Sequence, residues 1–461
     1  MNNKLKKAVI LLVWLLIWQV TALIVNNPIY FASPLETAAE LVSKIGQPLF
    51  WRSVGGSLIR IFAGFATASV LAFAAAFATH RYKWLEDLIS PFVTFIKSVP
   101  VATVAVILLI WWGPRYLVLC ISLMVVFPNI YSNMQTGINS ADKGLLEMAS
   151  VFDIKARDRF LWVYRPAYIP YLHSAVSVAI GMCFKSGIAA EVIGLPEFSA
   201  GEQLYRDKIY LNTAGVFAWV VVILILSAVV ERLIVFGLKK LAEVPDACPD
   251  EEGIRTSAGD LNIIREHGSK TVFSDGVLKS YAGRDIVDTM LSLEEGGIYY
   301  LMAPSGAGKT TLLKMIAGII SPDKGNVSTG RISMVFQDDR LIESANAFRN
   351  LMTAGCTGDL AFELLRLLPK EALKLRASDL SGGERRRLAI ARALLHPSDI
   401  VIMDEPFAGL DEDTKQITIK WIMKHLEGRT LLLTAHEADE VGFTDAKMIS
   451  LKDQTGEING N

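Results

Sequence analysis

The residues that decide the fold are 298–319, which read IYYLMAPSGAGKTTLLKMIAGI. An apolar run of strand type ends at Pro304, a loop with two glycines follows, and an apolar pattern with helical spacing begins near Leu312. In such an arrangement the backbone N–H groups of the loop turn inward around an anion, and the helix start adds the positive end of its dipole. The stretch therefore predicts a P-loop that binds nucleotide phosphates within an α/β domain.

This loop supplies the groups that a nucleotide and its Mg²⁺ require. We expect Lys309 to reach the β- and γ-phosphates and Thr310 to offer its hydroxyl to Mg²⁺. Ala303 occupies the position of the motif's first glycine, and we expect its methyl group to disturb the loop little. The predicted nucleotide-binding residues of the loop are Ser305, Gly306, Ala307, Gly308, Lys309, Thr310 and Thr311.

A second apolar strand, predicted over Asp399–Met403, ends in the adjacent carboxylates Asp404 and Glu405. We expect Asp404 to hold Mg²⁺, directly or through water, and Glu405 to orient and polarise the attacking water. These residues fit any ATPase with a P-loop.

The sequence Leu380-Ser381-Gly382-Gly383-Glu384 resembles the signature of ABC ATPases, and the resemblance extends over Val272–Leu451. In that family two ATPase domains face head to tail, and each signature completes the partner's nucleotide site. The resemblance implies that Ser381, Gly382 and Gly383 bind the ATP held by a second chain.

Four further residues extend this resemblance. Gln337 and His436 each follow a predicted strand. The resemblance implies that Gln337 contacts Mg²⁺ and the attacking water, and that His436 contacts the γ-phosphate. It also implies that Asp411 crosses the dimer interface and that Tyr281 stacks on adenine. Every catalytic position is filled, which predicts an active ATPase; the expected catalytic residues are Lys309, Gln337, Glu405 and His436.

The N-terminal half has a different character, and it raises the hydrophobic content of the whole chain to 52%. Six segments come close to the roughly 20 apolar residues that a membrane-spanning helix needs. They are Ala8–Val25, Val54–Thr79, Ile89–Trp112, Tyr116–Tyr131, Ala175–Ile193 and Gly215–Phe236. The first has the basic start of a secretory signal peptide, but the absence of a small-residue cleavage site favours a retained span.

The longest predicted inner loop, Ser132–Tyr171, contains Glu147-Met148-Ala149, with Pro166 nineteen residues after Glu147. It resembles the EAA coupling loop of bacterial binding-protein-dependent importers, in which two short helices press into a groove on the ATPase. The resemblance implies coupling roles for Glu147, Ala149, Asp153 and Pro166. Asp153 stands where the family usually has glycine, so its turn must form without glycine's freedom at positive φ. A generic inner loop is the alternative.

Two phrases, Ser57-Leu58-Ile59-Arg60 and Lys97-Ser98-Val99-Pro100, resemble the permease subfamily that imports nitrate, sulfonates such as taurine, and thiamine-precursor pyrimidines. This similarity covers about residues 50–235. Charges within a membrane are expensive, so they mark functional candidates. Lys185 lies near the middle of its span, where a cation suits an anionic solute; a lysine that pairs with a carboxylate or snorkels is the alternative. The candidates for the solute path are Arg60, Lys97, Lys185 and Glu191.

We therefore expect an all-α polytopic membrane domain with six transmembrane helices, followed by an α/β P-loop ABC ATPase domain with a helical subdomain. The predicted domains are a permease (1–241), a linker (242–270) and an ATP-binding domain (271–456). Basic residues cluster in the expected inner loops, so we expect a multi-pass protein of a bacterial cytoplasmic membrane with its N-terminus and ATPase in the cytosol.

The expected function is ATP-driven import of a small anionic or heterocyclic solute. The expected partners are a second copy of the chain or a similar half-transporter, an external substrate-binding protein, and the lipid bilayer. A formal net charge of −1 gives no indication of nucleic-acid binding. The four scattered cysteines predict unpaired thiols. The alternatives are an ABC exporter half-transporter and a non-transporting ABC machine that passes force to an envelope partner.

Overall fold

The computed structural model of the chain contains two compact units. One comprises residues 1–140 and 167–244, and the other comprises residues 141–166 and 245–461. The structure describes residues 3–242, 272–281, 283–304, 306–356, 363–364, 366–434, 443 and 446–451. Ser305, His436 and the predicted linker 242–270, apart from Ala242, lie outside these residues.

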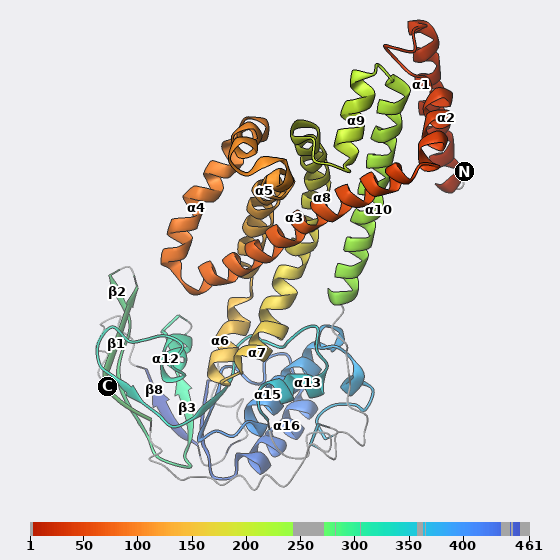
Figure 1. Cartoon of the computed structure of the whole chain (residues 1–461). Helices are drawn as coiled ribbons and strands as arrows, with labels where there is room; N and C mark the ends of the chain where they lie inside the picture. Colours follow the sequence, from red (N-terminus) through yellow and green to blue (C-terminus); the bar gives the residue numbers. More distant parts are fainter. Residues whose placement is uncertain are drawn as a thin grey trace. The chain divides into compact units, whose positions relative to one another are not determined.

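The first unit is built from helices over its described residues (Figure 1). They are α1 (Asn3–Val25), α2 (Pro34–Ile45), α3 (Pro48–Arg81), α4 (Lys83–Ser98), α5 (Val101–Asn139), α8 (Arg165–Gly194), α9 (Ala200–Ile209) and α10 (Thr213–Ala242). By length and composition, four helical stretches of the described chain can cross a membrane: Pro48–Arg81, Val101–Asn139, Ala156–Gly194 and Thr213–Lys240. Helix α1 adds a shorter apolar stretch, Val9–Val25.

The predicted span Ile89–Trp112 is divided between two helices. Val99, which precedes a proline, has φ of −83° and ψ of 130° and separates α4 from α5, because the residue before proline is disfavoured in the α region. Within α5, Gly113 has φ of 73° and interrupts the helix, and Pro114 follows it. The predicted span Tyr116–Tyr131 therefore lies in the second part of α5.

Small residues bring the helices of the first unit close together. A Cβ atom at Gly64 of α3 would lie 2.6 Å from Cβ of Ser122 on α5. A Cβ atom at Gly137 of α5 would lie 2.8 Å from Cα of Tyr168 on α8. Glycine at such positions lets backbones approach within a membrane, where van der Waals packing holds helices together. Helices α3, α5 and α8 therefore pack against one another.

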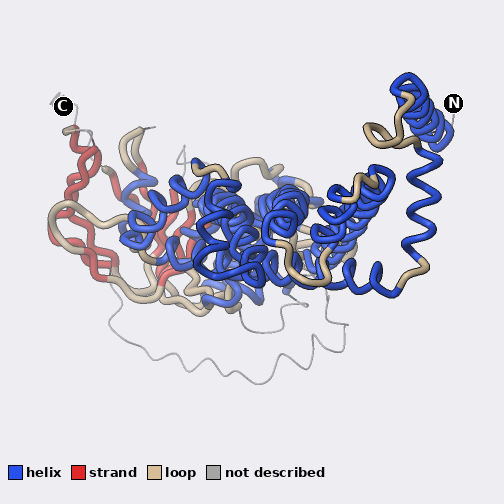
Figure 2. The backbone as a smooth tube through the Cα atoms, turned by 45° about the horizontal axis from the view of Figure 1, so that its top comes forward, coloured by secondary structure: helices blue, strands red, loops and turns tan. Residues whose placement is uncertain are grey.

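The second unit contains two sheets, whose strands are red in Figure 2. A parallel sheet has the order β5-β6-β7-β3-β8, and an antiparallel sheet has the order β2-β1-β4. The strands are β1 (Val272–Tyr281), β2 (Arg284–Leu293), β3 (Ile298–Met302), β4 (Val327–Ser328), β5 (Ile332–Val335), β6 (Ile400–Met403), β7 (Thr430–Thr434) and β8 (Lys447–Ser450). Strands β6 and β7 are buried along their whole length, as expected for apolar strands in the middle of a parallel sheet.

The helical elements of this unit include the segment 141–166, which lies between α5 and α8 in the sequence. They are α6 (Lys143–Val151), α7 (Ala156–Arg159), η1 (Phe160–Tyr164), α12 (Lys309–Ile316), α13 (Ala347–Thr353), η2 (Ala372–Lys374), η3 (Ala377–Asp379), α15 (Gly382–Leu395) and α16 (Glu412–Leu426). The parallel pairing places the carboxyl ends of β5, β6, β7 and β3 along one edge of the sheet, where α/β proteins bind ligands.

Candidate active site

The loop between β3 and α12 has the backbone that a phosphate cradle needs. Gly306 and Gly308 have φ of 83° and 88°, values that favour glycine. A Cβ atom at Gly308 would also lie 2.7 Å from the carbonyl oxygen of Ile286, so no side chain fits there. Ala303 has no positive φ, which explains how an alanine can replace the motif's first glycine without backbone strain.

Lys309 is the first residue of α12, and its side chain folds back over the loop. The residue is 9% exposed, and Nζ donates to the carbonyl oxygen of Ala303 at 2.5 Å. No carboxylate among the described residues forms an ion pair with this ammonium group. A buried cation without a counter-ion favours an anionic ligand, so the positive charge is available to phosphate.

Asp404 joins the loop to the central strands. It follows β6, is 2% exposed, and accepts hydrogen bonds from the hydroxyls of Thr310 at 3.0 Å and Thr434 at 2.8 Å. The structure thus brings together the carboxylate and the hydroxyl that were predicted to bind Mg²⁺. These hard oxygen donors fit Mg²⁺, which typically binds one or two carboxylates together with the phosphates of its nucleotide.

Glu405 adopts an unusual backbone conformation, with φ of 50°. This left-handed region is costly for residues other than glycine, so the neighbours must hold the residue in place. Its N–H donates to the hydroxyl of Thr434 at 3.0 Å, so one threonine contacts both carboxylate residues. Strain of this kind is often found at active sites.

The signature sequence forms the start of α15. Ser381 is the N-cap, and its N–H and hydroxyl donate to the carboxylate of Glu384 at 2.8 and 2.7 Å. These hydrogen bonds lower the pKa of Glu384. Ser381 and Gly382 are exposed, and Gly383 is half-buried, so within this chain the helix start is open to a ligand.

Three other predicted residues lie on the surface of this unit. Tyr281, at the end of β1, is 48% exposed. Gln337 is exposed and follows β5, the strand next to β6. Asp411 is the N-cap of α16 and accepts a hydrogen bond from the N–H of Thr414 at 2.9 Å, which lowers the pKa of Asp411. Their contacts with a nucleotide stay predictions, as does the role of His436.

Glu147, on α6, pairs with two cations of the ATPase. Its Oε2 atom lies 2.7 Å from Nη1 of Arg340 and 3.1 Å from Nζ of Lys314. Burial opposes ionisation of Glu147, but the hydrogen bonds and charges of the two cations outweigh it and lower the pKa of this carboxyl. The sequence predicted the acidic partner and missed both cations, because ion pairs across a fold leave no mark in local sequence.

The turn after α6 is also packed into the ATPase unit. Phe152 is 2% exposed and makes an edge-to-face contact with the ring of His396, with centroids 5.1 Å apart. The guanidinium of Arg392 lies 5.1 Å from the centroid of the same ring. Asp153 has φ of 46°, so the turn does use the left-handed conformation in which glycine is favoured. Ala149 is fully buried, and Pro166 lies in the first turn of α8.

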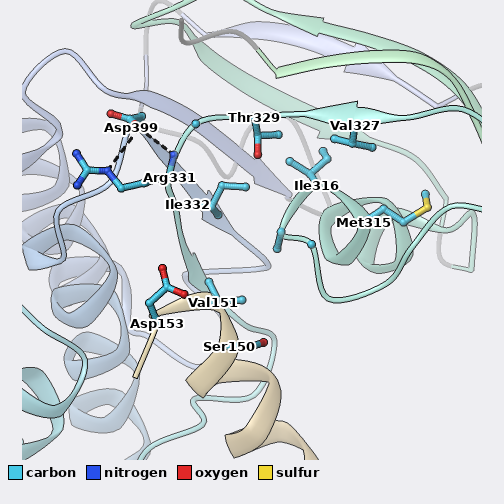
Figure 3. Close-up of a pocket in the computed structure, with 13 residues that line it drawn as sticks. Ser150, Val151, Asp153, Met315, Ile316, Val327, Thr329, Arg331, Ile332 and Asp399 are labelled. Atoms are coloured by element: carbon cyan, nitrogen blue, oxygen red, sulfur yellow. Dashed lines mark hydrogen bonds and ion pairs between the residues drawn. The ribbon is translucent and has the colours of Figure 1, made fainter. Parts of the chain in front are cut away.

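A cavity of about 1010 Å³ adjoins this turn (Figure 3). Ser150, Val151 and Asp153 line it beside Met315 and Ile316, which end α12. Across the cavity, Asp399 accepts a hydrogen bond from the N–H of Arg331 at 2.8 Å. The helix that begins at the phosphate loop thus ends next to the segment 141–166.

The charged candidates of the first unit separate into two groups. Glu191 is fully buried and accepts hydrogen bonds from Ser57 at 2.6 Å, Arg60 at 3.2 Å and the N–H of Gly201 at 3.2 Å. This network joins α3, α8 and α9 and satisfies both charges, so it favours a structural role for Arg60 and Glu191.

The two lysines have different surroundings. Nζ of Lys97 donates to the hydroxyl of Ser132 at 2.8 Å, and Lys185 is exposed on α8. Among the residues that the structure describes, no carboxylate forms an ion pair with either lysine. The pairing that was the alternative for Lys185 is therefore not observed in this part of the chain.

Comparisons with known proteins identify both halves. The family described as "ABC transporter" matches residues 286–408, and "Binding-protein-dependent transport system inner membrane component" matches residues 68–240. The aliphatic sulfonates import ATP-binding protein SsuB 1 of Rhodococcus jostii (strain RHA1) is 37% identical over 36% of this chain and 73% of its own length.

Other relatives differ in what they transport. The Nod factor export ATP-binding protein I of Paraburkholderia xenovorans (strain LB400) is 34% identical over 36% of this chain and 62% of its own length. The molybdenum import ATP-binding protein ModC of Brucella abortus (strain 2308) is 38% identical over 32% of this chain and 48% of its own length. A solved dimeric ATP-binding cassette with bound ADP and Pi is 26% identical, with a TM-score of 0.36, over 39% of this chain and 94% of its own.

Proposed function

Because the chain belongs to the ABC transporter family, with a permease domain fused to an ATPase domain, we propose that it imports a small anionic solute of the sulfonate type. It is a membrane protein that binds ATP and couples ATP hydrolysis to transport. The proposed boundaries are 1–241 for the permease, 242–270 for the linker and 271–456 for the ATPase. The proposed location is a bacterial cytoplasmic membrane, with the ATPase and the N-terminus in the cytosol.

The proposed site assigns each residue a role. Lys309 and the N–H groups of the loop bind the β- and γ-phosphates, and Tyr281 stacks on adenine. Thr310 and Asp404 hold Mg²⁺, with Gln337 nearby; when bound, the metal neutralises charge on the phosphate oxygens. Glu405 orients the attacking water, and His436 contacts the γ-phosphate. Support for these roles comes from the shared hydrogen bonds of Thr310, Asp404 and Thr434.

By similarity to ABC ATPases, in which each signature completes the nucleotide site of the facing domain, we propose a second copy or a similar half-transporter as the partner. The exposed start of α15 at Ser381–Gly383 would bind the nucleotide of that partner, and Asp411 would lie at the interface. An external substrate-binding protein would deliver the solute, in line with the family matched by residues 68–240.

The observation that carries the import proposal is the packing of residues 141–166 into the ATPase unit. Glu147 pairs with Arg340, which lies just after the predicted Gln337, and with Lys314 of α12. Since this segment lies between α5 and α8 in the sequence, a movement of the nucleotide site can be transmitted to both helices. The relative named for Nod factor export suggests the opposite direction, whereas the permease match supports import.

The class of solute is proposed from the two lysines without carboxylate partners. Asn129 of α5 lies 3.9 Å from the sulfur of Met182 on α8. Since the two helices run antiparallel, Ser132 and Lys185 each lie one helical turn from this contact, in opposite directions. Lys97 adds its ammonium group at Ser132. This face therefore offers two cations and neutral polar groups, which suits an anion such as a sulfonate.

The test is transport by the full-length chain in liposomes with its substrate-binding protein. We expect taurine or another alkyl sulfonate to stimulate ATP hydrolysis and to accumulate on the side of the membrane that carries the ATPase. Accumulation on the side opposite the ATPase would instead show export. Lys97→Met and Lys185→Met should each lower sulfonate uptake at least about tenfold while basal ATP hydrolysis persists; unchanged uptake in both would exclude the proposed solute site.

A further inference from the structure

Arg386 is a buried cation that donates mainly to backbone carbonyl oxygens. It lies on α15, in the second turn after Ser381, and is 3% exposed. Its five hydrogen bonds to carbonyl oxygens are Nε to Pro406 (3.1 Å), Nη1 to Phe336 (2.6 Å) and Gln337 (3.3 Å), and Nη2 to Asp404 (2.8 Å) and Glu405 (2.5 Å). Nη1 also lies 3.3 Å from a carboxylate oxygen of Asp339.

These acceptors belong to two loops that carry predicted catalytic residues. Phe336 and Gln337 follow β5, and the three residues from Asp404 follow β6. A guanidinium has its five N–H donors in a rigid planar fork, so a single side chain can fix several carbonyl oxygens at once. Lysine, with three donors at one point, cannot reproduce this arrangement.

The contact with Glu405 is important because of that residue's strained backbone. Its φ of 50° requires support from neighbours, and Nη2 of Arg386 holds its carbonyl oxygen while Thr434 holds its N–H. Arg386 thus restrains the peptide unit that sets the direction of the Glu405 side chain.

We propose that Arg386 is a positioning residue that fixes Gln337 and Glu405 relative to each other. Because it lies on the signature helix, it also links the start of α15 to this chain's own hydrolytic carboxylate. Binding of the partner's nucleotide at Ser381 thereby promotes hydrolysis in the site of the chain that supplies the signature. This link rests on the proposed function, since it requires the paired arrangement of two ATPase domains.

A second buried arginine of the same helix provides a contrast. Arg392 is fully buried and donates to the carbonyl oxygens of Asp339 at 2.9 Å and Arg340 at 2.6 Å. It therefore fixes the part of the loop after β5 that includes Arg340, the partner of Glu147. Within the described residues, none of its hydrogen bonds reaches the loop after β6. Arg386 is the one of the pair that contacts Glu405.

The test measures kcat, KM for ATP and melting temperature of the full-length chain in nanodiscs. The variants are Arg386→Lys and Arg386→Gln, with Arg429→Lys as the matched control. Arg429 is also buried and donates to backbone carbonyl oxygens, those of Leu394, His425 and Leu426, away from both loops. We expect both Arg386 variants to lower kcat about 10- to 100-fold, the loss typical of a displaced catalytic group, with KM changed less than about threefold. The control should keep kcat within about twofold.

A purely structural role would give a different result. It would lower the melting temperature and raise KM without a selective loss of kcat, and this outcome in both Arg386 variants would overturn the proposal. Absence of ATP hydrolysis in the wild type would instead refute the proposed ATPase site, so the two failures are distinguishable.

The link to the signature is tested with Ser381→Ala and its combination with Arg386→Lys. If the two residues act in one chain of contacts, the double variant should lose little more activity than the worse single variant. Losses that multiply would show independent action and would contradict the link.

Discussion

Replacing Glu147 by glutamine tests whether its two ion pairs hold the coupling segment on the ATPase. The change removes one charge and keeps the size of the side chain. Helix α6 has only nine residues, too few to persist in water without packing. Exchange of its backbone amides therefore reports how often the segment leaves its contacts.

The magnitude follows from the burial of the pair. The side chain of Glu147 is 30% exposed and that of Arg340 is 10% exposed, so the interaction lies between a solvent-exposed ion pair and a buried one. Exposed pairs contribute up to about 1 kcal/mol, and hydrogen bonds to charged groups about 1.5–3 kcal/mol. We expect Glu147→Gln to lower the opening free energy of the segment by about 1–2 kcal/mol, or roughly 5- to 30-fold in its equilibrium constant.

The assay is hydrogen–deuterium exchange by mass spectrometry on peptides covering residues 143–152 at neutral pH. Exchange there should accelerate by the same factor, and transport per ATP hydrolysed should fall. Glu371→Gln, at an exposed position of the same unit, is the control and should leave both quantities unchanged. Unaltered exchange in Glu147→Gln would refute the assignment of the pair as the contact that holds the segment.

Four other changes have defined outcomes. Glu405→Gln should lower ATP hydrolysis at least about 100-fold in a phosphate-release assay and retain ATP binding by filter assay; near-normal turnover would exclude Glu405 as the hydrolytic carboxylate. Asp153→Gly should unfold at a higher temperature than Asp153→Ala, by the equivalent of about 1 kcal/mol, because φ of 46° favours glycine; equal melting would show no strain there. Gly64→Ala should lower the melting temperature of the permease, by about 1–3 kcal/mol of overpacking, whereas Gly55→Ala, which meets no atom within 4 Å, should not; equal effects would contradict the close α3–α5 contact. Burial lowers the pKa of His396, so the unfolded chain takes up a proton more readily, and the ATPase unit should lose stability as pH falls below about 6.5; His396→Gln should flatten this dependence in melting curves from pH 7.5 to 5.5.

The parts of the site that a sequence predicts well are those set by local chain geometry. The loop at Gly306–Lys309 requires glycines at fixed spacing between a strand and a helix, so residues 298–319 carried nearly all the information. Asp404 and Glu405 were predicted for the same reason, because they directly follow an apolar strand in the sequence. The meeting of Thr310 with Asp404 then follows from parallel pairing.

Contacts that depend on the direction of a side chain could not be predicted in this way. The sequence has three consecutive arginines at 385–387, and composition cannot tell which of them is buried. The structure shows that Arg386 alone of these three is buried, because its face of α15 lies against the loops after β5 and β6. The cations that pair with Glu147 were missed for a related reason, since Arg340 and Lys314 lie far from it in sequence.

The division of one predicted span has a local cause that hydropathy does not detect. Val99 and Pro100 are apolar or neutral, so a count of apolar residues runs straight through them. The conformational restriction before proline nevertheless ends α4, and Gly113 then interrupts α5.

Helix α12 has eight residues and is therefore only about 12 Å long. Lys309 is at one end, and Lys314 and Met315 are near the other, beside Glu147 and the cavity. Because two turns of helix cannot bend appreciably, a displacement of the first turn moves the last turn by nearly the same amount. The length of α12 also determines the direction in which Lys314 points. One inserted residue would rotate Lys314 by about 100° around the helix axis and turn its ammonium group away from Glu147.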